Sequence, residues 1–278
     1  MQKRLLFRGQ LLEYEITGTG TPVMFVHGFT EDRRIWGSLL NGIKNNFLFI
    51  IPDLPGSGGS GYNESTIQLR DFADALKAIT DNENIQQFIL IGHSMGGYIS
   101  LAFAEKYPDL LLGLGLFHSS AYADSNEKKE TREKNIRFIQ KNDPALYVAQ
   151  AIPGLFAEKF KSEHPEVIDD LVTRYSDFQS APLVQYLEAM KNRADTSGVL
   201  KTISKPVLFI IGEEDKAVPM KDSLEQSHLP NTSYIHLMTN TAHMGMIENT
   251  NLCSAFIERF LTDIDHPMFH IEKYSKHE

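Results

Sequence analysis

The feature that most constrains this chain is a serine enclosed by glycines, between a strand pattern and a helix pattern. Residues 87–91 form a predicted strand, and residues 95–106 form a predicted helix that ends before Pro108. The turn between them, Gly92-His93-Ser94-Met95-Gly96-Gly97, fits the pattern G-x-S-x-G. Larger side chains at the glycine positions would collide with the strand and the helix. The unit therefore predicts a sharp turn that presents the Ser94 hydroxyl as a nucleophile.

Short apolar runs alternate with helix-period segments along much of the chain, as in a mostly parallel sheet covered by helices. Residues 4–7 and 12–16 are predicted to form an antiparallel hairpin. Further strands are predicted at residues 23–26, 47–51, 112–117, 207–211 and 234–237. Covering helices are predicted at residues 33–44, 66–80 and 249–261. The pattern indicates an α/β fold.

Residues 121–197 interrupt this alternation, because they contain no convincing strand and many charges. Helices are predicted at residues 126–141, 144–150, 166–175 and 182–193. We interpret the segment as a helical cap inserted into a core domain formed by residues 1–120 and 198–278. The first of these helices carries charges of both signs, which predicts a solvated face with i,i+4 pairs; an anion-binding surface is the alternative. The polar residues 263–278 fit either an ordered extension or a frayed tail.

Composition narrows the class of protein. The chain has 278 residues, of which 42% are hydrophobic and 23% charged, as in a globular protein with a substantial core. The net charge of −9 argues against a nucleic-acid partner, because phosphate binding needs clustered Lys and Arg. The single cysteine, Cys253, allows no intramolecular disulfide and is interpreted as a small buried hydrophobe.

The sequence shows neither a signal-peptide pattern nor a membrane-span pattern. The first residues lack the apolar stretch of a signal peptide, and no apolar run approaches the roughly 20 residues that cross a bilayer. We therefore expect a cytoplasmic protein with no membrane span. Composition leaves the oligomeric state open, as monomer or homodimer.

Together these segments resemble the α/β-hydrolase superfamily over residues 4–262. Its members order their catalytic residues along the chain as serine, acid and histidine. Residues 212–219 (G-E-E-D-K-A-V-P) resemble its G-x-x-D-x-x-V-P turn, and residues 241–245 (T-A-H-M-G) resemble its histidine loop. The resemblance implies that His243 is the general base for Ser94 and that Asp215 is the acid that orients it. A solvated acidic loop is the alternative for Asp215.

The resemblance also implies two backbone donors for the oxyanion of an acyl-transfer reaction. One is the N–H of Met95, directly after the nucleophile. The other is the N–H of Phe29, because residues 27–30 (H-G-F-T) resemble the superfamily's H-G-x segment. His27 and Gly28 are expected to shape that loop, and a simple glycine turn is the alternative.

A second glycine-rich loop, residues 52–60 (P-D-L-P-G-S-G-G-S), resembles the superfamily's D-x-P-G-x-G-x-S element. A phosphate-binding loop is the alternative, but the Gly-Lys-Ser/Thr ending of a P-loop and the spacing of a dinucleotide fingerprint are missing. We interpret the loop as a structural turn. No cluster of His, Cys or Asp has metal-ligand spacing, so we expect neither a metal nor a cofactor.

Within the superfamily, the chain looks most like small capped esterases, lactonases and carbon–carbon bond hydrolases. We expect hydrolysis of a carboxylic ester, lactone or thioester of a small, mainly hydrophobic substrate through an acyl-enzyme on Ser94. A carbon–carbon bond hydrolase or lyase and an acyltransferase are alternatives, and a non-catalytic ligand-binding receptor is a remote one. Haloalkane dehalogenases and epoxide hydrolases of this fold are disfavoured, because they use Asp where Ser94 stands.

Candidate substrate-binding residues are apolar or aromatic, and all fit core packing equally well. They are Trp36, His118, Tyr122, Phe156 and Met244, with Phe29, Met95 and Leu155 as further candidates. Relatives that act on menaquinone precursors often carry Arg at the position of Tyr98 to bind a carboxylate. Tyr98 departs from that pattern, which disfavours this substrate class.

Overall fold

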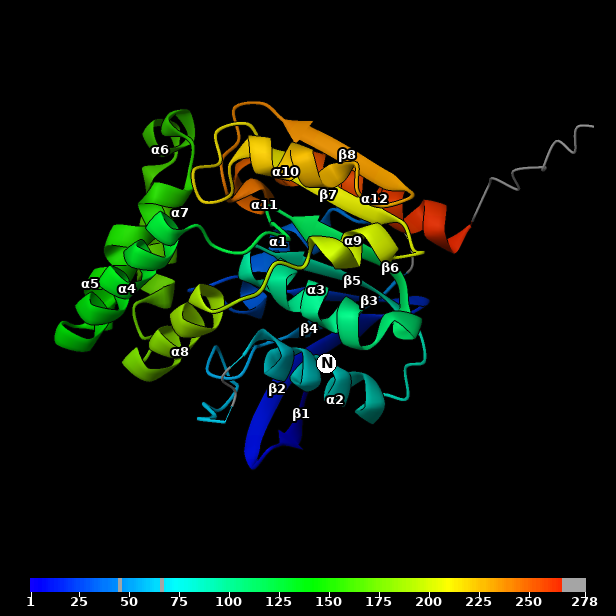
Figure 1. The fold of residues 1–278 in the computed structure, drawn as a ribbon, viewed down its shortest axis with the longest axis horizontal. Coiled ribbons are helices and arrows are strands. Elements are labelled where there is room, and N and C mark those ends of the chain that lie inside the picture. Colours follow the sequence, from blue (N-terminus) through cyan, green and yellow to red (C-terminus); the bar gives the residue numbers. More distant parts are fainter. Residues whose placement is uncertain (45–46, 66–67, 267–278) are drawn as a thin grey trace, which may run out of the picture.

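The computed structural model describes residues 1–44, 47–65 and 68–266, and an eight-stranded sheet lies at its centre (Figure 1). The strands are β1 (Gln2–Phe7), β2 (Gln10–Gly18), β3 (Thr21–Val26), β4 (Phe47–Pro52), β5 (Phe88–His93), β6 (Leu111–Phe117), β7 (Val207–Gly212) and β8 (Ser233–Met238). Their order in the sheet is β1-β2-β4-β3-β5-β6-β7-β8. Strand β2 pairs antiparallel with β1 and β4, and the other neighbours pair in parallel. The predicted α/β fold class is confirmed.

Helices cover both faces of this sheet. Helices α2 (Leu69–Asn82), α3 (Met95–Lys106) and α9 (Ser197–Thr202) pack together, and Figure 1 shows them in front of the strands. Helices α1 (Gly37–Asn41), α11 (Gly245–Glu248) and α12 (Thr250–Asp265) form a second packed group. Helix α10 (Met220–Ser227) packs against β7. Within the residues that the structure describes, no helix is long and apolar enough to cross a membrane.

The helix predictions for the core need correction. The helix expected at residues 33–44 is a 3-10 turn, η1 (Arg33–Trp36), followed by the short α1, because α1 begins at Gly37 and ends before Gly42, and glycine disfavours helix. Helices α9, α10 and α11 were not predicted. The last helix continues to Asp265, beyond the predicted end at residue 261. Residues 66 and 67, at the predicted start of α2, and residues 267–278 of the polar segment lie outside the described residues.

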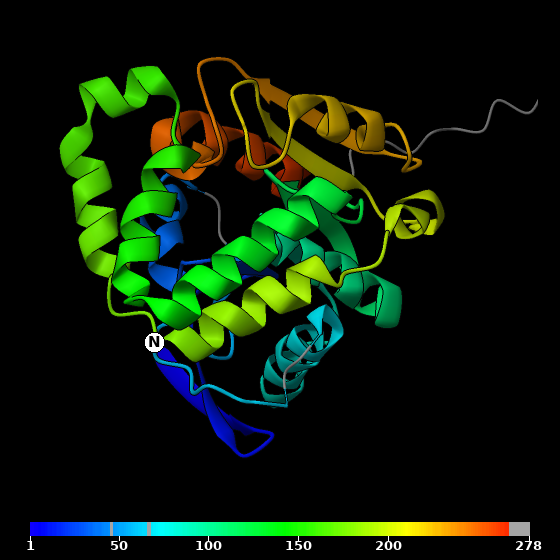
Figure 2. The same cartoon turned by 60° about the vertical axis from the view of Figure 1, so that its left-hand side comes forward.

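Between β6 and β7 lies a block of helices, residues 126–191, which we call the helical block. It consists of α4 (Asn126–Lys141), α5 (Pro144–Ala151), η3 (Ile152–Leu155), α6 (Glu158–Glu163), α7 (Pro165–Tyr175) and α8 (Ser180–Lys191). Four of these helices match predictions, whereas η3 and α6 were not predicted. Helices α4 and α8 run side by side (Figure 2). Figure 1 shows the block beyond one end of the sheet, where the carboxyl ends of the parallel strands lie.

The helical block is hydrogen-bonded to the loops of the sheet. The Tyr186 hydroxyl donates to the carbonyl of Pro55 over 2.8 Å, and Gln185 Nε2 donates to the carbonyl of Asn63 over 2.8 Å. Both donors lie on α8, and Tyr186 is completely buried. Because a buried polar group is costly to leave without a partner, these contacts fix where α8 lies on the core.

Candidate functional site

The predicted serine turn has the strained geometry that its sequence demands. Ser94 joins β5 to α3 with φ 50° and ψ −114°, a region that L residues rarely occupy. Its N–H donates to the carbonyl of Phe117 over 2.9 Å, which ties the turn to the end of β6. A Cβ at Gly92 would collide with the backbone of Gly96, and a Cβ at Gly96 would collide with the carbonyl of Val26. The glycines are therefore required by close backbone approach.

Asp215 and His243 meet across the loops that follow β7 and β8. His243 Nδ1 donates to Asp215 Oδ2 over 2.8 Å, and both side chains are buried. The other oxygen of Asp215 accepts the N–H groups of Ala217 and Val218, each over 2.8 Å. Because Nδ1 is the donor, the second ring nitrogen of His243, Nε2, is left to accept a proton. The predicted acid and base are thus adjacent, and the acid is fully hydrogen-bonded.

The pKa of Asp215 reflects this environment. Burial alone would raise the pKa of the carboxyl, but the charge of His243, its hydrogen bond and the nearby His118 outweigh burial and hold the pKa well below the usual range. Asp215 is therefore ionised at any pH at which the protein would work. A fixed negative charge beside the imidazole stabilises its protonated form.

Ser94 and His243 line the same cavity, whose volume is about 510 Å³. The structure has no hydrogen bond between Ser94 Oγ and the imidazole of His243 among its described residues. Such contacts are often long without substrate and tighten only when it binds.

The two predicted oxyanion donors lie in the segments after β3 and β5. Phe29 follows β3 and lines the cavity, and Met95 opens α3 directly after Ser94. Among the described residues, neither backbone N–H donates a hydrogen bond, so both remain available for an acceptor. His27 shapes the loop as expected: its Nδ1 donates to the carbonyl of Gly28, and its Nε2 accepts the N–H of Leu54.

A buried ion pair that the sequence did not reveal supports both loops. Glu31 accepts the N–H of Gly28 over 2.7 Å and lies 3.0 Å from His93 Nδ1. His93 Nε2 donates to the carbonyl of His243 over 3.0 Å. Both ring nitrogens of His93 thus face acceptors, which requires the protonated imidazole. Burial would lower the pKa of His93, but Glu31 outweighs it and raises the pKa, while the pKa of Glu31 is lowered. His93 was expected to support the turn, and its partner was missed.

His118 was a candidate for the cavity wall, and the structure corrects this. It follows β6, is 1% exposed, and does not line the cavity. Its Nδ1 lies 3.4 Å from Asp215 Oδ2, behind the acid–base pair. Its Nε2 packs tightly against Gly245. A Cβ at position 245 would lie only 2.5 Å from this nitrogen, which is too close. The side chain is therefore a neighbour of Asp215 and has no contact with the cavity.

The aromatic and apolar candidates are divided by burial. Tyr122 lines the cavity as predicted. Trp36, Phe156 and Met244 do not: they are 0%, 3% and 2% exposed and belong to the core. The Trp36 ring lies 5.1 Å from that of Phe25, centroid to centroid, beneath the site. These three predictions are wrong because large apolar side chains fit a core and a pocket wall equally well.

The cavity wall combines two chemistries. Its apolar and aromatic members are Phe29, Tyr98, Tyr122, Tyr147, Leu155, Met190 and Val218. Charged side chains line it as well, chiefly Asp124, Lys128, Arg132 and Arg193. The wall is therefore less hydrophobic than the sequence led us to expect.

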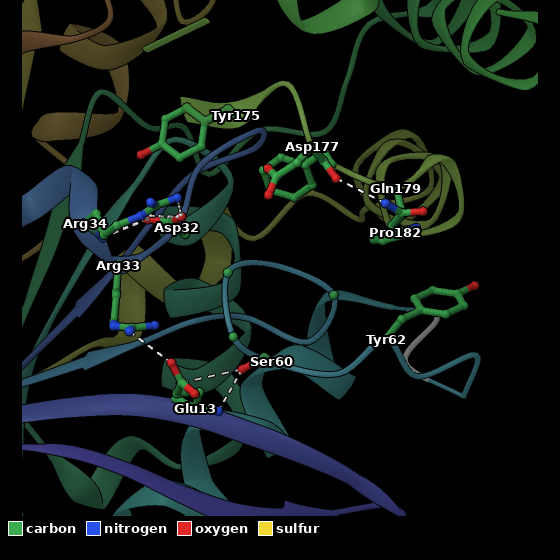
Figure 3. A pocket seen from close by; sticks show the side chains of 14 residues that line it. Glu13, Asp32, Arg33, Arg34, Ser60, Tyr62, Tyr175, Asp177, Gln179 and Pro182 are labelled. Carbon is green, nitrogen blue, oxygen red and sulfur yellow. Dashed lines mark hydrogen bonds and ion pairs between the residues drawn. The ribbon is translucent and has the colours of Figure 1, made fainter. Parts of the chain in front are cut away.

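A second cavity, of about 430 Å³, lies between the glycine-rich loop and the helical block (Figure 3). Its arginines are matched: Arg33 Nη2 lies 2.9 Å from Glu13 Oε1, and Arg34 Nη2 lies 2.6 Å from Asp32 Oδ2. The N–H of Gly59 in the loop donates to Asp53 over 2.8 Å. Because carboxylates already occupy these donors, the loop behaves as a structural turn and not as a phosphate cradle.

One group of side chains has the chemistry of metal ligands. His118, Asp215 and His243 place possible ligand atoms within 4.8 Å of one another. The oxygens of Asp215 are already engaged by His243 Nδ1 and by the N–H groups of Ala217 and Val218. The arrangement is that of a hydrogen-bonded acid–base pair, and the chemistry considered below requires no cation there.

Comparisons with known proteins agree with this architecture. A profile of the family described as alpha/beta hydrolase fold matches residues 21–250. The uncharacterized hydrolase YugF of Bacillus subtilis is 27% identical over 259 residues, which cover 89% of this chain and 92% of that protein. A thermophilic esterase from Thermogutta terrifontis, solved with malate bound, has a TM-score of 0.89 at 28% identity and covers 95% and 99% of the two chains. An enol-lactonase from Burkholderia xenovorans, at 20% identity and a TM-score of 0.85, covers 94% and 100% and is alike in fold.

Proposed function

The chain belongs to the alpha/beta hydrolase fold family, and we propose that it is a serine hydrolase that cleaves a carboxylic ester through an acyl-enzyme on Ser94. The observation that carries the proposal is the hydrogen bond of 2.8 Å between Asp215 and His243 beside the strained turn of Ser94. A serine hydroxyl is a poor nucleophile unless a base accepts its proton. The same arrangement would open a lactone or cleave a thioester.

In the first step, Ser94 Oγ attacks the acyl carbonyl carbon while His243 Nε2 takes the hydroxyl proton. Asp215 stabilises the resulting imidazolium by its fixed charge. The N–H groups of Phe29 and Met95 donate to the oxyanion, a contribution of about 3–4 kcal/mol for each donor in comparable enzymes.

In the second half of the reaction, His243 returns its proton to the leaving alcohol. A water molecule, deprotonated by His243, then attacks the acyl carbon and releases the acid. Ser94 is restored as the free hydroxyl. The buried pair of His93 and Glu31 has no step of its own and positions the loops that carry the oxyanion donor and His243.

In this proposal a cap of residues 121–197 covers the site and is inserted into a core of residues 1–120 and 198–278. The helical block forms most of this cap. Tyr147 and Leu155 of the block line the same cavity as Ser94. The N–H of His243 donates to the carbonyl of Leu155 over 2.9 Å, so the block touches the proposed base directly. Its helices therefore decide which acyl groups reach the serine.

Hydrolysis of p-nitrophenyl esters from acetate to decanoate tests the proposal. Ser94→Ala should lower kcat by more than about 10³-fold, because the nucleophile is removed while the fold is kept. Ser100→Ala is the matched control, since Ser100 lies on the same helix and only donates back to the carbonyl of Gly96 over 2.7 Å. It should retain the wild-type rate.

Two other outcomes are informative. Equal rates in wild type and Ser94→Ala would contradict the proposal. A wild type that is inert on every ester, but whose Ser94 reacts with a fluorophosphonate, would keep the acid–base pair and redirect the search to lactones, carbon–carbon cleavage and acyl transfer.

A further inference from the structure

Three cations surround one buried carboxylate on the wall of the Ser94 cavity. Asp124 lies in the segment between β6 and α4, Lys128 and Arg132 lie on α4, and Arg193 follows α8. All four line the cavity. We call Lys128, Arg132 and Arg193 the cationic cluster.

Asp124 joins the two guanidinium groups. Arg193 Nη1 lies 2.6 Å from Asp124 Oδ1, and Arg132 pairs through Nε with Asp124 Oδ2. Burial would raise the pKa of Asp124, but the hydrogen bond from Arg132 and the charges of Arg132, Arg193 and Lys128 outweigh it and lower the pKa. Asp124 is thus ionised. Among these four side chains one negative charge faces three positive ones, so the group is net positive, and Glu31, Asp222 and Lys216 line other parts of the cavity.

Each guanidinium keeps one nitrogen that can donate hydrogen bonds to a ligand. Within the described part of the chain, Arg132 Nη1 and Arg193 Nη2 donate no hydrogen bond. Lys128 Nζ makes one bond, to the carbonyl of Ala217 over 2.7 Å, and has further protons to donate. The arginines of the second cavity differ, because an acid there matches each of them.

The position of Arg193 is also held by an aromatic ring. Its guanidinium carbon lies 3.9 Å from the centroid of the Tyr98 ring, and Tyr98 lines the same cavity. The Nε of Arg193 donates to the carbonyl of Tyr122 over 3.1 Å. Stacking and hydrogen bonding fix the plane of the guanidinium, which suits it to bind a planar anion.

We propose that the cationic cluster binds a carboxylate of the substrate, so that the preferred ester carries an anionic group at the end remote from the scissile bond. This inference rests on the proposed function, because it names the substrate class of the same site. A carboxylate can accept charge-assisted hydrogen bonds from Arg132 Nη1, Arg193 Nη2 and Lys128 Nζ, one from each cation. The aromatic wall then holds the part of the substrate between the carboxylate and the ester.

A purely structural role is the competing explanation, since Asp124 and Arg193 lie where the helical block joins the core. The test therefore changes Arg132, whose side chain is 12% exposed and lies on a helix that folds over the cavity. Arg132→Gln removes the charge, and Arg132→Lys restores a charge without the guanidinium. Arg137→Gln is the control, because Arg137 lies on the same helix but is 53% exposed and, among the described residues, pairs only with Glu133.

Binding is measured first, in the Ser94→Ala background, so that turnover does not matter. Calorimetry compares 3-acetoxybenzoate with its neutral isostere 3-acetoxybenzamide. We expect the anion to bind roughly tenfold more tightly, as a charge-assisted pair allows. Arg132→Gln should abolish that preference, Arg132→Lys should restore part of it, and Arg137→Gln should keep it in full.

Kinetics with the active enzyme separate the explanations. Arg132→Gln should raise KM for 3-acetoxybenzoate roughly tenfold. It should leave KM for 3-acetoxybenzamide, and kcat for both esters, unchanged. An equal loss for both substrates indicates a structural role and overturns the inference. Equal binding of 3-acetoxybenzoate and 3-acetoxybenzamide by the protein with an unaltered cationic cluster also overturns the inference. If the anion binds preferentially but neither ester is hydrolysed and Ser94 is not labelled, the proposed function fails and the carboxylate site stands.

Discussion

Two histidines approach the same oxygen of Asp215, and only one of them can relay a proton. His243 Nδ1 lies 2.8 Å from Asp215 Oδ2, whereas His118 Nδ1 lies 3.4 Å from it. Burial is the main reason that the pKa of His118 falls to about 4. His118 is therefore neutral at neutral pH, and Asp215 keeps its charge for His243. The two imidazoles differ in their contacts, since His243 hydrogen-bonds to Asp215 and lines the cavity, whereas His118 does not line it.

This assignment predicts a specific dependence of stability on pH. The folded pKa of His118 is about 4, below the ordinary value of 6.5, so unfolding takes up a proton between these values. Its contribution is complete above pH 6.5 and is lost as pH falls toward 4. At pH 5 the loss should be about 2 kcal/mol relative to pH 7.5.

The variant His118→Asn should remove that loss, since Asn tolerates the positive φ of 46° at this position. The measurement is urea unfolding at pH 7.5 and pH 5, with His228→Asn, at an exposed site, as the control. The unfolding free energy of His118→Asn should change less with pH than that of the wild type. Parallel changes in the two proteins would show that His118 is not a buried neutral imidazole.

At the scale of elements, one short helix joins the histidine loop to the helical block. Glu248 of α11 accepts the N–H of Met244 over 3.0 Å and that of Ala242 over 3.1 Å, on either side of His243. It also accepts the N–H of Ala157, before α6, over 2.8 Å. One carboxylate thus fixes the loop of the proposed base and its contact with the block.

Glu248→Ala should lower both stability and activity. Three backbone donors lose their acceptor, which should cost about 3 kcal/mol in unfolding free energy. The value of kcat should fall as well, because the loop of His243 loses its support. Urea unfolding and ester hydrolysis check the two effects, with Glu225→Ala as the control, at an exposed position that pairs with Lys221. Wild-type stability in Glu248→Ala would contradict this role.

Sequence patterns located the elements better than the partners within the site. Helices α3 and α4 were predicted with their observed bounds, and α3 is marked by the glycine-rich turn before it and Pro108 after it. The short α6 and α10 lack such marks. Glu31 and Glu248 were missed because their partners, His93 and Ala157, are 62 and 91 residues away along the chain. No local pattern reports a contact that only the fold creates.

At the scale of the whole molecule, the site is assembled from segments that are distant in sequence. Phe29 follows β3, Ser94 follows β5, Asp215 follows β7 and His243 follows β8. The carboxyl ends of parallel strands meet at one edge of a sheet, so the fold brings the four loops together. The helical block lies over that edge and carries Lys128 and Arg132 of the cationic cluster, whose third member, Arg193, follows the block. The central claim is that this edge activates Ser94 through Asp215 and His243.

Labelling with a fluorophosphonate tests that claim most directly, because the reagent reacts with an activated serine whatever the substrate. Peptide mapping should locate the label on Ser94. The labelling rate constant should fall by about three to four orders of magnitude in Asp215→Asn and stay at the wild-type value in Glu213→Gln, an exposed neighbour in the same turn. A label on another residue, or equal rates in wild type and Asp215→Asn, would contradict the account.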